Sequence, residues 1–179
     1  MKSKKNIGLY LTIGFMVVLI ILLGYGLSLN PRDVPSPLIN KAAPDFEMPD
    51  LLDETRTFSK KELLGKVSLV NVWATWCPSC RAEHDVLLRI GDQVKIYGID
   101  WKDEPEKARN WLKTLGNPYL QTGSDVTGEH GINFGVYGAP ETYLINPQGI
   151  IIYKHTGPLT WDDWQNILLP KIKEISKSL

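Results

Sequence analysis

The chain begins with a long apolar stretch that carries no charge. Residues 7–29 read IGLYLTIGFMVVLIILLGYGLSL, a run long enough to cross the hydrocarbon layer of a membrane as a helix. A secretory signal has a shorter apolar core, although Gly26 and Ser28 are small residues that suit a cleavage site. The pattern therefore predicts a transmembrane anchor, with a cleaved signal peptide as the alternative.

The residues on either side of the apolar stretch indicate its orientation. Lys2, Lys4 and Lys5 precede it, and lysines of this kind remain on the cytoplasmic side of a membrane. The segment NPRDVPSPLINKAAP that follows is rich in proline and lacks periodicity, as a spacer does. The predicted organisation is a cytoplasmic N-terminus (1–6), a transmembrane anchor (7–29), a proline-rich linker (30–43) and an exported folded domain (44–179).

The first half of the domain has the pattern of a parallel crossover. Residues 66–75 and 94–101 are apolar runs rich in β-branched residues, typical of strands covered on both faces. Between them, 78–90 has an apolar stripe at helical spacing, and 104–115 has another. A strand, a helix and a second strand in this order predict a right-handed parallel unit.

The second half of the domain predicts a hairpin and a final helix. Residues 141–145 and 150–154 are short apolar strands joined by the turn sequence NPQG. Thr160 is a suitable cap for a last helix, and Pro170 should kink or interrupt that helix. The predicted order of the domain is therefore βαβ-α-ββα, an α/β fold.

Composition narrows the function mainly through charge and cysteine content. Twenty basic and twenty acidic residues cancel, so no long-range field attracts the chain to nucleic acid or anionic lipid, and we expect no nucleic-acid partner. The chain has two cysteines, Cys77 and Cys80, which form a CxxC motif where the first predicted strand passes into a helix. A disulfide between them closes too short a loop to stabilise a fold strongly, so the spacing favours redox chemistry.

The helix start assigns different roles to the two thiols. Pro78 suits the first turn of a helix, which places Cys77 at the N-terminus, where unpaired N–H groups stabilise a thiolate. Cys80 follows one turn later and is expected to be less exposed. We predict that Cys77 attacks a disulfide and that Cys80 resolves the mixed disulfide.

Metal binding is the alternative chemistry for the same motif. His84 follows Cys80 by one turn, and one imidazole with two thiolates suits copper or zinc, but only three ligands are visible. Covalent haem attachment needs a histidine directly after the second cysteine, and that residue is Arg81. We therefore expect no metal and no cofactor other than a redox-active Cys77–Cys80 disulfide.

Several segments in order carry a family resemblance. NVWATWCPSCRAEH and GAPETYLI resemble the thioredoxin superfamily, in which a cis-proline faces the CxxC motif; the matching residue is Pro140, preceded by Ala139. With GIDWKDEPEKARNWL and GVYGAPETYLINPQGIIIYKHTG, the similarity extends to the CcmG/DsbE family over residues 35–164. The resemblance implies a thioredoxin-like fold, with Trp76, Pro78, Ala139 and Pro140 contacting the substrate.

The same resemblance implies a role and partners. Members of this family are membrane-anchored reductants that act outside the cytoplasmic membrane in cytochrome c maturation. They keep the CxxCH thiols of apocytochrome c reduced, directly or through a maturation factor, and a membrane electron donor of the DsbD or CcdA type recharges them. The alternatives are a general thiol oxidant of the DsbA kind and a copper-binding chaperone that uses Cys77, Cys80 and His84.

One position departs from the thioredoxin pattern. Thioredoxin has a buried Asp in the strand below its CxxC, and the matching residue is Asn71, which cannot accept a proton. Glu141, next to Pro140, is the predicted general base in its place. Trp76 and Tyr137 either form an apolar rim for a bound peptide or belong to the core. The loop carboxylates Asp103, Glu104 and Glu129 either border the same face or are simply solvated.

Overall fold

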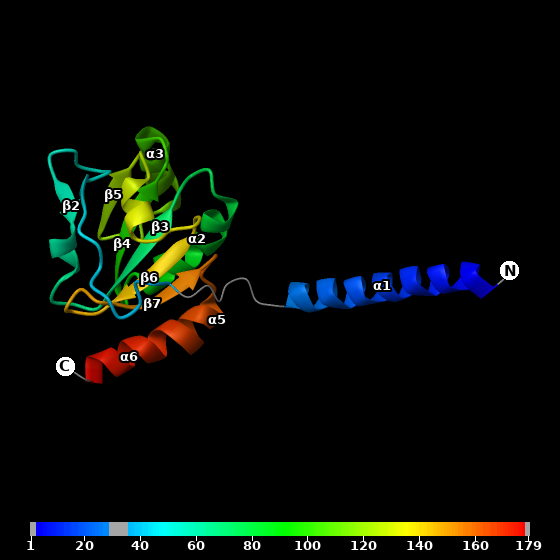
Figure 1. The fold of residues 1–179 in the computed structure, drawn as a ribbon. Coiled ribbons are helices and arrows are strands. Elements are labelled where there is room, and N and C mark those ends of the chain that lie inside the picture. Colours follow the sequence, from blue (N-terminus) through cyan, green and yellow to red (C-terminus); the bar gives the residue numbers. More distant parts are fainter. Residues whose placement is uncertain (1–2, 29–35, 178–179) are drawn as a thin grey trace. The chain divides into compact units, whose positions relative to one another are not determined.

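The computed structural model describes residues 3–28 and 36–177 and divides into two compact units, Met1–Val34 and Pro35–Leu179. In the first unit, α1 (Ser3–Ser28) is one continuous helix (Figure 1). Its segment Ile7–Leu27 has a mean hydropathy of 2.6 and no buried side chain. By length and composition, α1 is a candidate membrane anchor, as predicted.

The second unit is built around a five-stranded sheet with the strand order β5-β4-β3-β6-β7. β3, β4 and β5 are parallel, whereas β6 and β7 run antiparallel to their neighbours. β3 is therefore the central strand, paired on both edges. The strands are β3 (Ser68–Trp73), β4 (Lys95–Trp101), β5 (Gln121–Asp125), β6 (Glu141–Ile145) and β7 (Ile151–Thr156).

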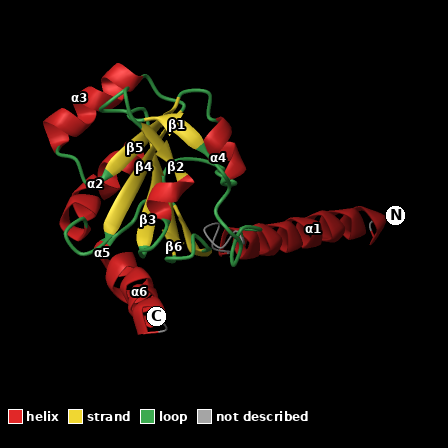
Figure 2. Ribbon diagram, turned by 90° about the vertical axis from the view of Figure 1, so that its left-hand side faces the viewer, coloured by secondary structure: helices red, strands yellow, loops and turns green. Residues whose placement is uncertain are grey.

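Helices and a small hairpin cover the two faces of this sheet (Figure 2). One apolar core includes Leu87, Ala108 and Trp164, which come from α2, α3 and the C-terminal helical segment. The other core includes Phe58 and Phe134, from the hairpin and the end of α4. The covering elements are β1 (Glu47–Pro49), β2 (Thr57–Ser59), the 3₁₀ turn η1 (Lys60–Leu63), α2 (Pro78–Ile90), α3 (Pro105–Leu115), α4 (Glu129–Asn133), α5 (Trp161–Asp163), the π-helix η2 (Trp164–Leu168) and α6 (Leu169–Lys177).

The thioredoxin-like α/β class is confirmed, and the elements that the pattern missed are short. β5 reads QTGSD and contains no apolar residue, so its sequence has no strand signal, yet four of its five residues are buried in the sheet. The hairpin β1–β2 has three residues on each strand. Strands of this kind form because neighbouring elements supply their hydrogen bonds, and local pattern does not reveal that.

The C-terminal helical segment is capped and interrupted where the sequence predicts. Thr160 and Asp163 form a reciprocal capping box at its start. A π-helical turn then precedes α6, whose second residue is Pro170. Because proline has no N–H to donate, the wider turn accommodates the lost hydrogen bond, and the helix continues to Lys177.

The folded domain begins earlier than the predicted boundary at residue 44. The N–H of Asn40 donates to Ile151 O, and the N–H of Ala43 donates to Gly149 O, both at 2.8 Å. Leu38 and Ile39 also pack against the second apolar core. Residues 36–43 are therefore part of the domain, because apolar side chains within the proline-rich segment find partners there. The remaining part of the predicted linker lies outside the described residues.

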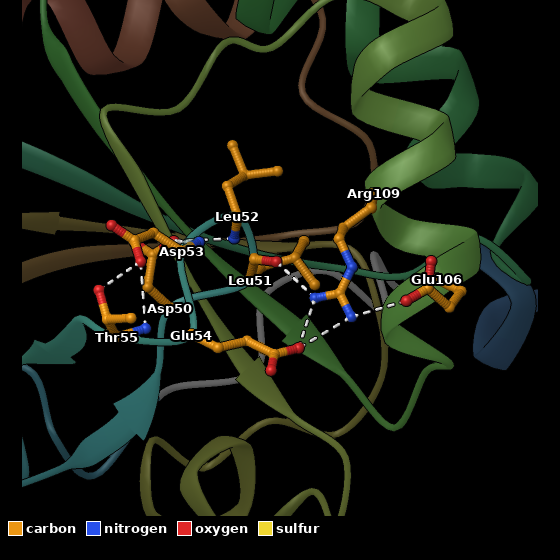
Figure 3. Close-up of polar contacts among 8 residues, drawn as sticks. All are labelled: Asp50, Leu51, Leu52, Asp53, Glu54, Thr55, Glu106 and Arg109. Atoms are coloured by element: carbon orange, nitrogen blue, oxygen red, sulfur yellow. Dashed lines mark hydrogen bonds and ion pairs between the residues drawn. The ribbon is translucent and has the colours of Figure 1, made fainter.

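Arg109 attaches the β1–β2 hairpin to α3 (Figure 3). Its guanidinium donates to Leu51 O at 2.8 Å and forms ion pairs with Glu54 at 3.1 Å and Glu106 at 2.9 Å. Within the hairpin, Asp50 Oδ1 accepts the N–H groups of Leu52 and Asp53. Arg109 thus joins two segments that lie far apart in the sequence.

We predict that Arg109→Ala lowers the free energy of unfolding by roughly 1–3 kcal/mol, because a charged donor to a backbone carbonyl is lost. The matched control is Lys107→Ala on the same helix, which removes an exposed ion pair with Glu104 and should cost under about 1 kcal/mol. Denaturant unfolding of the full chain in detergent measures both. Equal losses in the two variants would show that Arg109 contributes no more than a surface charge.

Candidate active site

The two cysteines lie at the point where β3 leads into α2. Cys77 is the N-cap residue of α2 and Pro78 occupies its first turn. Cys77 and Cys80 form a disulfide, and the N–H of Cys80 donates to Cys77 Sγ at 3.1 Å. The Cys77 sulfur therefore takes the place of the side-chain oxygen in an ordinary helix cap.

This geometry favours a thiolate on Cys77 after reduction of the disulfide. The first N–H groups of a helix have no backbone partner, and the positive end of the helix dipole points at the same sulfur. The first turn of α2 contains no acidic residue that would oppose this effect. A stabilised thiolate is both a better attacking group near neutral pH and a better leaving group.

The loop before β6 faces the disulfide. The Ala139–Pro140 peptide bond is cis, and Ala139 O lies 3.3 Å from Cys77 Sγ. Pro140 O is already bound by the N–H of Gly157 at 2.9 Å. The structure thus brings Cys77, Ala139 and Pro140 together, as the resemblance implies.

Exposure does not separate the two cysteines in the oxidised protein. Each is 3% exposed, whereas Trp76 beside them is 53% exposed and Pro78 is also exposed. The predicted difference in exposure between the thiols is therefore absent in this state. Their different positions on α2 remain, since Cys77 caps the helix and Cys80 lies on its buried face.

The loop that follows β4 holds the active-site loop in place. Asp103 accepts hydrogen bonds from both the N–H and the hydroxyl of Thr75, two residues before Cys77. Trp76 Nε1 donates to Lys102 O at 3.0 Å, so this exposed ring is fixed at one edge. Asp103 is buried and structural, whereas Glu104 and Glu129 are exposed at the ends of neighbouring helices.

Glu141, the predicted general base, lies on the opposite face of the sheet from α2. Its carboxylate forms a buried ion pair with Lys154 at 2.9 Å and accepts the hydroxyl of Tyr143 at 2.7 Å. Tyr143 belongs to the core that does not contain the cysteines. Adjacent residues of a strand point to opposite faces of the sheet. Although Glu141 follows Pro140 in the sequence, its carboxylate therefore does not reach Cys80.

A different carboxyl group, Glu83, shares the buried face of α2 with Cys80. Side chains three residues apart on a helix are neighbours. Glu83 Oε1 accepts Asn71 Nδ2 at 2.8 Å, and Oε2 accepts the N–H of Leu159 at 2.7 Å. Asn71 in turn accepts the hydroxyl of Tyr119 at 2.8 Å. The Asn71 side chain therefore does not itself accept a proton, but it orients the Glu83 carboxyl group, which can.

The surroundings of Glu83 favour its neutral form. Burial raises its pKa to about 7, and the hydrogen bonds from Leu159 and Asn71 oppose that shift only in part. Sequence analysis missed this residue because a glutamate on a helix is usually solvated. The available signal was its position, three residues after Cys80 on the apolar side of α2.

A second buried carboxyl group lies at the end of β4. The pKa of Asp100 is raised to about 8, mainly by burial and also by the nearby carboxylates Asp103 and Asp125. Asp103 is the residue that holds Thr75, so Asp100 lies beneath the support of the active-site loop. At neutral pH, Asp100 is therefore predominantly protonated.

His84 is engaged within the protein rather than presented as a ligand. Its Nε2 lies 3.1 Å from Gly116 O, and its Nδ1 accepts from Trp111 Nε1 at 3.4 Å. The first contact requires a proton on Nε2, so neither ring nitrogen retains a lone pair directed at the cysteines. Residues 3–28 and 36–177 contain no group of three or more potential metal-binding side chains.

A helix-capping cysteine pair that faces a cis-proline loop, at the end of the central strand of such a sheet, defines the thioredoxin-like thiol–disulfide oxidoreductases. The redoxin family model matches residues 38–168. DsbE of Pseudomonas aeruginosa is 46% identical over 96% of both chains, and DsbE of Allochromatium vinosum is 46% identical over 88% of both. DsbE of Escherichia coli K12 is 44% identical over 83% of this chain and 81% of its own. The chain belongs to the DsbE family of thiol:disulfide interchange proteins.

Solved structures support the fold. A secreted thiol-disulfide isomerase from Corynebacterium glutamicum superposes with a TM-score of 0.65 at 22% identity, covering 73% of this chain and 85% of that one. A DsbF homologue from Corynebacterium diphtheriae superposes with a TM-score of 0.64 at 19% identity, covering 85% and 95%. These structures show a thioredoxin-like fold, and the DsbE relatives together with the Cys77–Cys80 disulfide make the protein a thiol–disulfide oxidoreductase.

Glu83 makes the stability of the oxidised protein depend on pH. The folded protein keeps the Glu83 proton up to about pH 7, whereas the unfolded chain loses it near the ordinary value of 4.5. The contribution of Glu83 to the free energy of unfolding is thus fully present below pH 4.5. It falls by on the order of 3 kcal/mol as the pH rises to 7. We predict that Glu83→Gln abolishes this contribution, measured as the difference between wild-type and variant unfolding curves across pH.

The matched control is Asp85→Asn, an exposed carboxylate on the same helix. This variant should follow the wild-type pH dependence, including the part that Asp100 contributes up to about pH 8. A constant difference between Glu83→Gln and wild type from pH 4 to 8 would mean that the Glu83 carboxyl titrates normally in the folded protein.

Proposed function

We propose that this protein is a dedicated reductant in cytochrome c maturation, acting on the periplasmic side of the cytoplasmic membrane. The observation that supports it most is the capping position of Cys77, which suits a nucleophilic thiolate facing Ala139 and Pro140. Membership of the DsbE family and a candidate anchor preceded by three lysines support the location.

The reaction proceeds in two exchange steps. The Cys77 thiolate attacks one sulfur of the substrate disulfide, forming a mixed disulfide and releasing the other substrate sulfur as a thiolate. Cys80 then loses its proton and attacks Cys77 Sγ, which releases the second substrate thiol and forms the Cys77–Cys80 disulfide. Two electrons pass to the substrate, and a membrane electron donor of the DsbD or CcdA type restores the dithiol.

In this scheme, Glu83 accepts the Cys80 proton. Its pKa of about 7 is close to neutral pH, and a general base is most effective when its pKa lies near the pH of the reaction. Cis-Pro140 and Ala139 position the extended substrate backbone, and Trp76 with Tyr137 provides exposed aromatic surface beside it. The substrate is the CxxCH segment of apocytochrome c, or a maturation factor that passes the electrons on to that segment.

Replacing Cys80 tests the identity of the substrate. In Cys80→Ser, the mixed disulfide on Cys77 cannot be resolved, so we predict that a c-type apocytochrome or a cytochrome c maturation factor accumulates covalently bound to the variant in intact cells. Mass spectrometry of the trapped species identifies it. Cys77→Ser is the matched control and should trap nothing.

Two results would contradict this function. One is a trapped population made up of unrelated exported proteins that contain structural disulfides. The other is a reduction potential near about −120 mV, which belongs to a strong oxidant of the DsbA kind.

A kinetic experiment distinguishes the two buried glutamates, Glu83 and Glu141. We predict that Glu83→Gln slows resolution of the mixed disulfide by on the order of 100-fold at pH 7 and removes the inflection of this step at about pH 7. Glu141→Gln should leave resolution unchanged and lower stability instead, because it leaves Lys154 buried without its ion-pair partner. Stopped-flow measurement of the two exchange steps separates these outcomes, and slow resolution in Glu141→Gln alone would return the role to Glu141.

A further inference from the structure

The charges of the folded domain are separated between its two ends. The segments 60–67, 89–95 and 171–177 together contain eight basic and three acidic residues. The segments 50–56, 102–107 and 125–130, beside the active-site loop and the start of α3, contain eight acidic and three basic residues. The overall charge of zero therefore conceals a strongly polarised domain.

The basic segments meet at the end of the sheet opposite to the disulfide. β3 starts beside Lys66 and β4 starts at Lys95, whereas Cys77 follows the other end of β3. A hollow of about 370 Å³ at this end is lined by Lys66 and Lys95 together with Ile172 and Ser176 of α6. Figure 2 shows α6 at this end of the sheet, away from α3 and α4. We call this surface the basic end, and its lysines are Lys41, Lys66, Lys95, Lys173 and Lys177.

The lysines of the basic end are available to a partner. Lys41, Lys95, Lys173 and Lys177 are exposed, and Lys66 is half-buried with its ammonium 5.6 Å from the Tyr97 ring centre. The acidic residues among the three segments are Glu62, Asp92 and Glu174. Glu62 accepts the N–H and the hydroxyl of Ser59, and the eight basic residues of the three segments outnumber these three carboxylates.

The chain also joins the domain at this end. Asn40 and Ala43 are hydrogen-bonded to Ile151 and Gly149, beside the turn that links β6 to β7. The N–H of Gly65, next to Lys66, donates to Pro147 O in the same turn.

The sequence limits how far this point can lie from the apolar helix. Eight residues separate Leu27, the last residue of the candidate span, from Ser36. A fully extended segment of that length covers at most about 30 Å. Electrostatic attraction to a charged lipid surface acts over roughly 8 Å at physiological ionic strength. Because the connection is short, the domain stays near the lipid surface and its lysines frequently come within this range.

We propose that the basic end binds the anionic phospholipid headgroups of the membrane that holds α1. Clustered lysines are the side chains that a negatively charged lipid surface attracts. Binding through this surface leaves the opposite, acidic end and the Cys77–Cys80 disulfide free for soluble polypeptides. The proposal concerns only the surface of the domain and does not depend on which polypeptide is reduced.

The test uses the full chain reconstituted in lipid nanodiscs, and the readout is amide hydrogen exchange. In discs of equal parts phosphatidylglycerol and phosphatidylcholine, we expect exchange in 65–68, 91–95 and 171–177 to slow by about tenfold or more relative to discs of pure phosphatidylcholine. Exchange in 136–140 should not change. Raising the salt concentration to 1 M should abolish the difference, because charges are then screened within about 3 Å.

A matched pair of charge reversals keeps the proposal falsifiable. Lys95→Glu with Lys173→Glu should abolish the protection by anionic lipid, whereas Arg56→Glu with Lys107→Glu, which changes the net charge equally, should retain it. All four positions are exposed, and circular dichroism verifies that each variant folds. The proposal would be overturned if the exchange of these segments were the same in the two kinds of disc. It would also be overturned if both double variants lost the protection by anionic lipid.

Discussion

The hydrogen bond from the N–H of Cys80 to the sulfur of Cys77 is the interaction on which the active site depends. It exists because four residues separate the end of β3 at Trp73 from the start of α2 at Pro78, and the last of these residues, Cys77, becomes the cap of the helix. A sulfur in that position accepts from N–H groups that the helix cannot satisfy itself. The same arrangement stabilises the thiolate and fixes the distance to the resolving thiol.

The capped sulfur is held against a second rigid segment. Cis-Pro140 is bound through its carbonyl to Gly157, and the preceding Ala139 O lies beside Cys77 Sγ. On the other side, Asp103 binds Thr75 and Lys102 binds Trp76. The loops after β3 and β4 and the loop before β6 thus converge on one disulfide, which places the reacting atoms on a preorganised support.

Below the disulfide, polar groups replace the apolar side chains expected in a strand core. Asn71, Glu83, Tyr119 and Thr142 form one hydrogen-bonded network in which every contact is buried. Isolated polar groups at such depth are strongly destabilising, and mutual satisfaction offsets that cost. Because burial shields Glu83 from water and its two hydrogen-bond donors offset only part of that effect, its pKa rises into the range useful for proton transfer.

The sequence by itself determined the parts of this protein that depend on neighbours along the chain. The apolar run, the helix 78–90, the strand 141–145, the Thr160 cap and the CxxC motif are all local patterns, and the resemblance added the cis-proline. Only the tertiary structure decided that β5 is a strand and that Glu83, not the Glu141 beside Pro140, shares the face of Cys80. The physical reason is that contacts between residues distant in sequence set these features. They decide which face of the sheet a side chain points to, which face α2 packs on, and whether a polar edge strand pairs.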